Sequence, residues 1–153
     1  MICKDKRYLY SRTWEPKENF KPNYTLETAL VSIDQQTLQG ITFYGDQNNF
    51  QLLGINNNQI CVSLTKGGET TLLCEPIALP GATAVYLRME VINGYNCSFS
   101  YSIDGLQWEQ IPIRSTVNDD NKKLMQWDRI ARPGLYSQGT PERAVHFEYV
   151  TLK

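Results

Sequence analysis

The stretch VYLRMEVINGYNCSFSYSIDGLQW, residues 85–108, decides the fold of this chain. Apolar residues occupy every second position from Val85 to Val91, and Tyr86, Arg88 and Glu90 fill the alternate positions. A period of two is typical of a β-strand with one buried face. The sequence therefore predicts a strand here, with Tyr86, Arg88 and Glu90 on the face directed away from the core.

Two turn signals divide this stretch into a meander. Asn93-Gly94 and Asp104-Gly105 favour the positive φ angles that tight hairpins require. Between them, residues 97–103 alternate apolar side chains with serines, which predicts a second strand. If the Asp104-Gly105 turn is a two-residue loop, Tyr101 pairs with Trp108, and this aromatic pair fixes the register. On this interpretation Trp108 has a structural role.

The rest of the chain shows the same short alternating runs and no helical period. Further strands are predicted over residues 8–14, 24–33, 38–44, 49–55, 132–137 and 144–152. About ten short strands with turn signals every 8–12 residues or so are typical of an all-β protein with two packed sheets. A chain of 153 residues can bury one substantial core. We therefore expect residues 1–153 to form a single domain, a two-sheet antiparallel β-sandwich of the concanavalin A-like, jelly-roll type.

Composition excludes several classes of partner. The formal net charge of −1 gives no electrostatic attraction to nucleic acid or to an anionic membrane, so neither is expected as a partner. No apolar run approaches the roughly 20 residues of a membrane span. Residues 1–14 also lack the apolar core of a signal peptide. The chain is thus expected to be either cytosolic or a domain of a longer secreted protein.

Nothing in the sequence has the pattern of a catalytic or metal site. His146 is the single histidine, so neither a histidine cluster for zinc nor a catalytic triad is expected. Sandwich glycosidases place two carboxylates across a cleft, and on a strand such acids should recur at alternate positions. The strands predicted here carry no such acidic ladder. Asp119 and Asp120 lie in a polar segment without the glycine-containing pattern of a calcium loop. We predict no catalytic residue, no metal and no cofactor.

Two of the four cysteines are expected to face each other. A hairpin that turns at Gly67-Gly68 pairs Lys66 with Glu69 and, further along, Cys61 with Cys74. That second pair falls at a non-hydrogen-bonded position, where Cα atoms lie about 4.5 Å apart and a cross-strand disulfide is geometrically possible. The alternative is a pair of small side chains that simply pack together. The sequence leaves both interpretations open.

A sugar-binding surface has more support than an active site. A pyranose needs an aromatic ring for its apolar face and polar groups for its hydroxyls. Tyr86, Arg88 and Glu90 supply both kinds of group, and Tyr44 joins them if its strand is a neighbour; Trp14 and Trp127 lie in polar sequence and could border such a surface. For each residue taken singly a structural role is the alternative, as a ring over a sheet edge or as one member of a cross-strand ion pair. The candidate carbohydrate-binding residues are Tyr44, Tyr86, Arg88, Glu90 and Trp127.

Five segments, taken in order, resemble one known family. They are GITFYGDQNNFQLLGI (40–55), VYLRMEV (85–91), FSYSIDGLQW (99–108), RPGLYS (132–137) and AVHFEYV (144–150). Together they resemble the C-terminal concanavalin A-like β-sandwich of glycoside hydrolase family 43 enzymes, the β-xylosidases and α-arabinofuranosidases. The resemblance covers most of the chain from about residue 8 onward.

This resemblance implies a role as well as a fold. Catalysis in that family belongs to carboxylates of a separate five-bladed β-propeller, so the chain is expected to be a non-catalytic accessory domain of a hemicellulose-degrading enzyme. Its expected partners are the catalytic propeller and glycans of the xylan or arabinan type, in the periplasm or outside the cell. Two alternatives remain: a free-standing lectin-like module, and a polysaccharide lyase or glucanase on the same fold, whose signature residues are missing here.

Overall fold

The computed structural model describes residues 22–114 and 131–153. This part of the chain consists of β-strands joined by turns and loops. The strands are β1 (Tyr24–Val31), β2 (Leu38–Asp46), β3 (Asn49–Asn56), β4 (Gln59–Lys66), β5 (Glu69–Leu72), β6 (Ile77–Ala78), β7 (Ala84–Ile92), β8 (Asn96–Ser102), β9 (Glu109–Ile111), β10 (Arg132–Gln138) and β11 (His146–Leu152).

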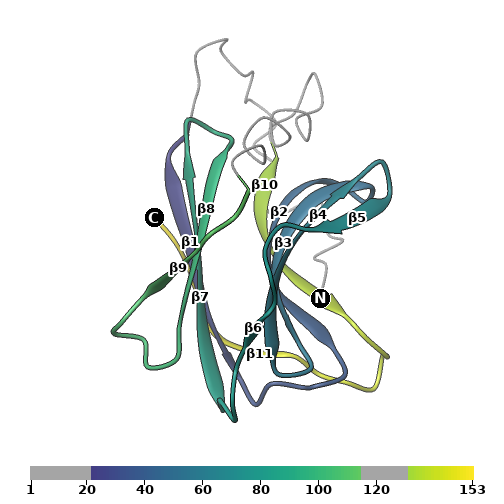
Figure 1. Cartoon of the computed structure of the whole chain (residues 1–153), viewed down its shortest axis with the longest axis vertical. Coiled ribbons are helices and arrows are strands. Elements are labelled where there is room, and N and C mark those ends of the chain that lie inside the picture. The colour runs from purple at the N-terminus through teal and green to yellow at the C-terminus, as the bar shows by residue number, and fades with distance from the viewer. Residues whose placement is uncertain (1–21, 115–130) are drawn as a thin grey trace.

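The strands form two antiparallel sheets that stack face to face (Figure 1). Sheet A has the order β11-β1-β7-β8-β9, and sheet B has the order β10-β2-β3-β4-β5, with β6 also paired to β4. This arrangement confirms the predicted two-sheet sandwich. Among the described residues no helix is long and apolar enough to cross a membrane.

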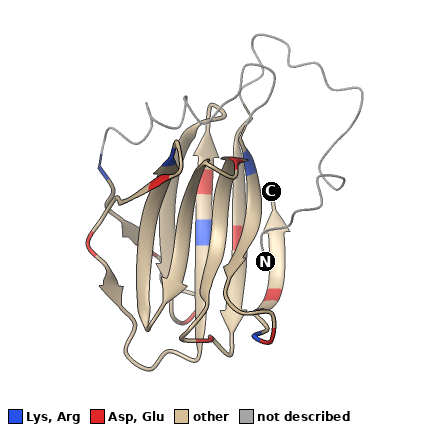
Figure 2. Ribbon diagram, turned by 90° about the vertical axis from the view of Figure 1, so that its right-hand side faces the viewer, with Lys and Arg blue, Asp and Glu red and all other residues tan. Residues whose placement is uncertain are grey.

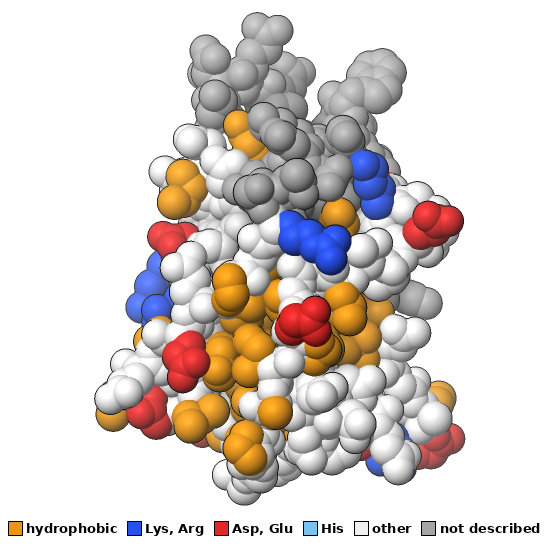
Figure 3. All heavy atoms as spheres, viewed as in Figure 1, with side chains coloured by type: hydrophobic (Ala, Val, Ile, Leu, Met, Phe, Trp, Pro, Cys, Tyr) orange, Lys and Arg blue, Asp and Glu red, His pale blue; other side chains and the backbone are white. Residues whose placement is uncertain are grey.

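The core lies between the sheets and is built from alternate positions of each strand. In β7 the side chains of Val85, Leu87, Met89 and Val91 are fully buried, which confirms the period of two. From sheet B, the fully buried side chains that join the same apolar cluster are Ile41, Phe43, Leu53, Ile55, Ile60 and Val62. Figure 3 shows apolar side chains gathered between the two sheets. Charged residues on the strands are few and scattered (Figure 2), so the sheets are held chiefly by apolar burial.

Most predicted strands are present with bounds close to those expected. The predictions for residues 24–33, 38–44, 49–55, 132–137 and 144–152 correspond to β1, β2, β3, β10 and β11. The predicted strand at residues 8–14 lies outside the described residues. The Gly67-Gly68 hairpin is also confirmed, because Lys66 pairs with Glu69 and both glycines have positive φ.

The predicted pairing of Tyr101 with Trp108 is wrong. Tyr101 pairs with Glu109, because the loop after β8 is longer than two residues. Asp104 Oδ1 accepts hydrogen bonds from the backbone N–H groups of Leu106 and Gln107, each at 2.8 Å, and these bonds extend the turn. Trp108 therefore precedes β9 and is not part of the ladder.

The loop that replaces the expected tight turn is locked by its own side chains. Ser102 Oγ accepts the N–H of Gly105 at 2.9 Å and donates to Asp104 Oδ1 at 2.9 Å. Ile103, expected to continue the apolar row of β8, is 64% exposed in this loop, and Leu106 is 84% exposed. The exposure of these two aliphatic side chains is therefore fixed by a hydrogen-bonded turn.

Candidate functional site

An ion pair crosses the outer face of sheet A. Glu27 on β1 and Arg88 on β7 are register partners, and both point away from the core. Arg88 donates from Nε and Nη2 to Glu27 Oε2, at 3.0 and 2.8 Å. Tyr149 on β11 donates its hydroxyl to the other oxygen, Glu27 Oε1, at 2.7 Å. The carboxylate thus joins side chains from three adjacent strands.

Trp108 stacks on this ion pair. The guanidinium carbon of Arg88 lies 3.6 Å from the centroid of the indole ring, a cation–π contact. Arg88 is held in place by Glu27, so the ring rests on a positioned support. Trp108 itself remains partly exposed. We call Trp108, Arg88, Glu27, Tyr149 and Tyr86 the sheet A patch.

Tyr86 completes the patch beside Tyr149. Their ring centroids are 6.5 Å apart with an interplanar angle of 42°. Gly105, at a φ of 75°, packs against the Tyr86 ring so closely that an added Cβ would lie 3.0 Å from Cζ. The loop after β8 therefore covers part of Tyr86, and both Tyr86 and Trp108 remain partly exposed. Glu90, two residues beyond Arg88 on the same face of β7, is exposed.

The hydrogen bonds of the patch set its ionisation. Burial opposes the charge on Glu27, but the hydrogen bonds from Tyr149 and Arg88 and the charges of Arg88 and Lys153 outweigh it, so the pKa of Glu27 is lowered. Burial and the hydrogen bond to Glu27 raise the pKa of Tyr149. At neutral pH the patch therefore holds a carboxylate, a guanidinium and a neutral phenol.

Tyr44 lies on the opposite face of the molecule. Its strand, β2, belongs to sheet B, so it is not a neighbour of β7, and Tyr44 does not join Tyr86, Arg88 and Glu90. The outer face of sheet B carries its own aromatic group, the sheet B patch of Tyr44, Phe50 and Tyr136. Phe50 lies 6.2 Å from Tyr44 and 5.7 Å from Tyr136, between ring centroids.

The rings of the sheet B patch cover one another. Tyr136 is only 5% exposed, and its hydroxyl donates to Gln138 Oε1 at 2.8 Å. Its ring and that of Phe50 stack at 28°, so each covers part of the other. Burial and the nearby Asp46 carboxylate raise the pKa of Tyr44, which keeps its phenol neutral. These rings mainly pack together.

Trp127, the remaining predicted carbohydrate-binding residue, lies outside the described residues, as does Trp14. Sequence reasoning missed three members of the sheet A patch. Glu27 and Tyr149 were missed because nothing in one sequence says that β1 lies between β7 and β11. Trp108 was missed because the two-residue turn assigned it to the ladder.

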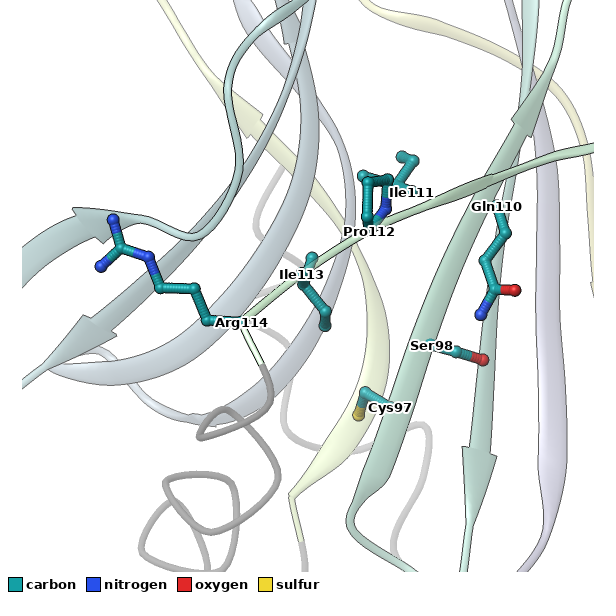
Figure 4. A pocket seen from close by; sticks show the side chains of 7 residues that line it. All are labelled: Cys97, Ser98, Gln110, Ile111, Pro112, Ile113 and Arg114. Atoms are coloured by element: carbon teal, nitrogen blue, oxygen red, sulfur yellow. The ribbon is translucent and has the colours of Figure 1, made fainter.

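A hollow lies beside the ends of β8 and β9 (Figure 4). It is lined by Cys97, Ser98, Gln110, Ile111, Pro112, Ile113 and Arg114. Arg114 extends away from the other six side chains. Burial raises the pKa of the Cys97 thiol, so it stays protonated and is a poor nucleophile. In residues 22–114 and 131–153 no group of three or more His, Cys, Asp and Glu side chains is placed to hold a metal ion.

Comparison with known proteins identifies the domain. The family model described as the beta xylosidase C-terminal concanavalin A-like domain matches residues 19–153. The chain belongs to this family. A search of curated protein sequences gives no match.

Solved structures similar to this concanavalin A-like domain include two bacterial glycosidases. Xylan beta-1,4-xylosidase from Bacillus halodurans C-125 is 20% identical, with a TM-score of 0.69 over 86% of this chain and 27% of that one. The GH43 protein BlXynB from Bacillus licheniformis is also 20% identical, with a TM-score of 0.66 over 85% and 27%. Chicken galectin 2 is 10% identical, with a TM-score of 0.50 over 88% and 95%. At these identities the likeness establishes the fold, and this domain spans about a quarter of the length of each glycosidase.

Proposed function

We propose that this chain is a non-catalytic accessory domain of a family 43-type glycoside hydrolase and that it binds a neutral glycan of the xylan or arabinan type on the sheet A patch. The observation that carries the binding site is the position of Trp108. Its indole is partly exposed on the outer face of sheet A and rests on Arg88, which Glu27 holds in place.

The patch has the chemistry that a sugar ring requires. The apolar face of a pyranose stacks on an aromatic ring, and tryptophan offers the largest one. The Arg88–Glu27–Tyr149 chain of hydrogen bonds orders the support before a ligand arrives, which lowers the entropic cost of binding. The Tyr86 hydroxyl and the exposed Glu90 carboxylate, on either side of Arg88 along the outer face of β7, are groups able to bind sugar hydroxyls. Arg88 is already paired, so the patch favours a neutral glycan over an anionic one.

The expected protein partner is a catalytic domain in the same polypeptide. The matched family is described as a C-terminal domain of beta xylosidases, and the similar glycosidase structures are several times longer than this chain. We therefore propose that hydrolysis is performed by a separate propeller domain.

Calorimetric titration with xylo-oligosaccharides, xylan and arabinan tests the binding site. Trp108→Ala and Tyr44→Ala form a matched pair, because each removes a partly exposed aromatic ring, on opposite faces. We expect saturable binding that Trp108→Ala weakens by about 5- to 150-fold, if stacking of a sugar on the indole is worth about the 1–3 kcal/mol of a nucleobase on an aromatic ring. Tyr44→Ala should bind as wild type.

Other outcomes would change the assignment. Loss of binding in Tyr44→Ala alone would move the site to sheet B, and no binding to any glycan would refute glycan recognition while leaving an accessory structural role. Release of reducing ends from xylan, arabinan, alginate or glucan by the purified chain would overturn the non-catalytic assignment in favour of a lyase or glucanase.

A further inference from the structure

The outer edge of sheet B is interrupted opposite Cys61. On one side of the interruption Ser63 pairs with Leu72, and the N–H of Leu73 donates to the carbonyl of Val62 at 2.8 Å. On the other side β6 resumes the ladder, with Ile77 opposite Ile60. Residues 74–76 therefore form a bulge that faces Cys61 alone, and Cys74 is its first residue.

The pairing of the strands places Cys61 and Cys74 opposite each other at a position where the two backbones come close. Pairs in an antiparallel hairpin alternate between hydrogen-bonded and non-hydrogen-bonded, with Cα atoms about 4.5 Å apart in the latter. The bond between Leu73 and Val62 marks their pair as hydrogen-bonded, so Cys61 and Cys74 fall in the next, closer class.

A threonine pair between β4 and β5 shows how close side chains come at a non-hydrogen-bonded position of this hairpin. Thr65 and Thr70 lie four residues from Cys61 and Cys74, on the same face and at the same phase of the ladder. Their Oγ1 atoms are 2.8 Å apart. Side chains at non-hydrogen-bonded positions of this hairpin therefore contact each other across the strands. The bulge begins at Cys74 and does not disturb the pairs before it.

The two thiols are free in this structure and differ from Cys97 in access. Cys61 and Cys74 are both partly exposed, whereas Cys97 is buried. Burial and the neighbouring Cys74 thiol raise the pKa of Cys61, which is consistent with their closeness. A disulfide oxidant in solution can reach the first two thiols and not the third.

We propose that Cys61 and Cys74 form a redox-sensitive clip that fastens the bulge to β4. A low-molecular-weight disulfide such as glutathione disulfide first forms a mixed disulfide with one cysteine and releases one thiol. The second cysteine then displaces the other thiol. Two cysteine thiols become one Cys61–Cys74 disulfide, and one oxidant disulfide becomes two thiols, so electrons and protons balance.

The clip would act on stability rather than on ligand binding. A cross-link between residues 61 and 74 restricts the unfolded chain and so favours the folded state. It also fixes β6, which is only two residues long and pairs with β4 at Gln59 and Ile60. In an oxidising compartment the clip would be closed, and under reducing conditions it would be open. This inference does not depend on the proposed glycan site.

Glutathione disulfide titration of the purified chain tests the clip. After oxidation, alkylation and mass spectrometry should show loss of two of the four cysteine thiols, an intact mass lower by two hydrogens, and a cross-linked peptide joining Cys61 to Cys74. The melting temperature should rise by about 5–10 °C and return when dithiothreitol is added.

Three variants serve as controls. On oxidation, Cys61→Ser and Cys74→Ser should show no rise in melting temperature. Cys97→Ser should show the same rise on oxidation as the wild-type chain, measured from its own reduced form. The proposal is overturned if all four thiols remain titratable, if Cys61 accumulates only as a glutathione adduct, or if the cross-linked peptide joins either residue to Cys3 or Cys97.

Discussion

Glu27 shows how one side chain can order a surface. Both of its carboxylate oxygens accept hydrogen bonds, one from Tyr149 and the other from Arg88, and Arg88 in turn supports Trp108. A change at Glu27 should therefore be felt at Trp108 even though these two residues do not pair directly.

Glu27→Gln should lower stability in a pH-dependent way. The folded-state pKa of Glu27 lies below its ordinary value of 4.5, so its carboxylate stabilises the fold above about pH 4.5 and this contribution is lost as pH falls through the lowered pKa. Above pH 4.5 the variant should be less stable by about 1 kcal/mol, given the partial exposure of the pair. Urea unfolding at pH 7 and pH 3 measures the difference, and an equal difference at both values would contradict the assignment.

Two buried glutamines on the inner side of sheet B provide a contrast. Gln39 and Gln51 are both fully buried. Gln39 Nε2 donates to the carbonyls of Asp34 and Thr37, at 2.7 and 3.2 Å. Among the described residues neither Gln51 Oε1 nor Gln51 Nε2 has a hydrogen-bond partner, and Gln39 Oε1 has none either, so Gln39 is bonded through its Nε2 alone. A buried amide without partners costs free energy, whereas a bonded one does not.

Gln51→Met should therefore be neutral or stabilising, by up to about 1 kcal/mol. Gln39→Met should destabilise the domain by about 1–2 kcal/mol, since it removes two hydrogen bonds to backbone carbonyls, those of Asp34 and Thr37. Chemical denaturation of the two variants under the same conditions measures both effects. A loss of stability in Gln51→Met as large as that in Gln39→Met would mean that water or another group bonds the Gln51 amide.

Strands β2 and β3 approach each other closely at a pair of glycines. Gly40 lies opposite Gly54, and a Cβ added at Gly40 would collide with the carbonyl oxygen of Leu53 and lie 2.9 Å from the Gly54 Cα. Backbone atoms cannot yield to such a contact without moving the strand.

Gly40→Ala should thus cost about 3 kcal/mol, the upper end of the range typical of overpacking, because the clash is with backbone atoms. Gly67→Asn is the matched control, because nothing lies within 4 Å of a Cβ there and asparagine tolerates its φ of 59°. The control should cost well under 1 kcal/mol. Thermal unfolding of both proteins distinguishes a steric effect in the ladder from a general intolerance of glycine replacement.

The alternation of apolar and polar residues predicts most of the described strands, but it does not predict which strands pair with each other. A period of two shows which side chains of β7 face the core, because burial alternates within one strand. It does not show which strands share a sheet, so Tyr44 was grouped with Tyr86 although they lie on opposite faces. The loop after β8 was misjudged for a different reason: Ser102 and Asp104 bond to backbone N–H groups and lengthen a turn that Asp-Gly alone would keep short.

For the whole molecule, one continuous core joins the two sheets. Leu53 of sheet B and Leu87 of sheet A are both fully buried and belong to the same apolar cluster. Leu53→Ala and Leu87→Ala should each destabilise the domain by about 2–5 kcal/mol. Each variant should unfold in a single transition, seen equally by far-ultraviolet circular dichroism and tryptophan fluorescence. Separate transitions for the two probes would show that the sheets unfold independently.

Strand β11 forms an outer edge of sheet A, and its irregularities bear on how the protein behaves at high concentration. Within residues 22–114 and 131–153 no strand pairs with the outer side of β11, and such an edge offers its backbone groups to another strand. Val150 and Leu152 are also 47% and 51% exposed here. Two features oppose this: the register between β1 and β11 shifts between Ala29 and Leu30, which distorts the edge, and the exposed Glu148 places a charge along it. We therefore expect the bulge and the charge to disfavour edge-to-edge addition of further copies, and so to oppose fibrous aggregation of the folded domain.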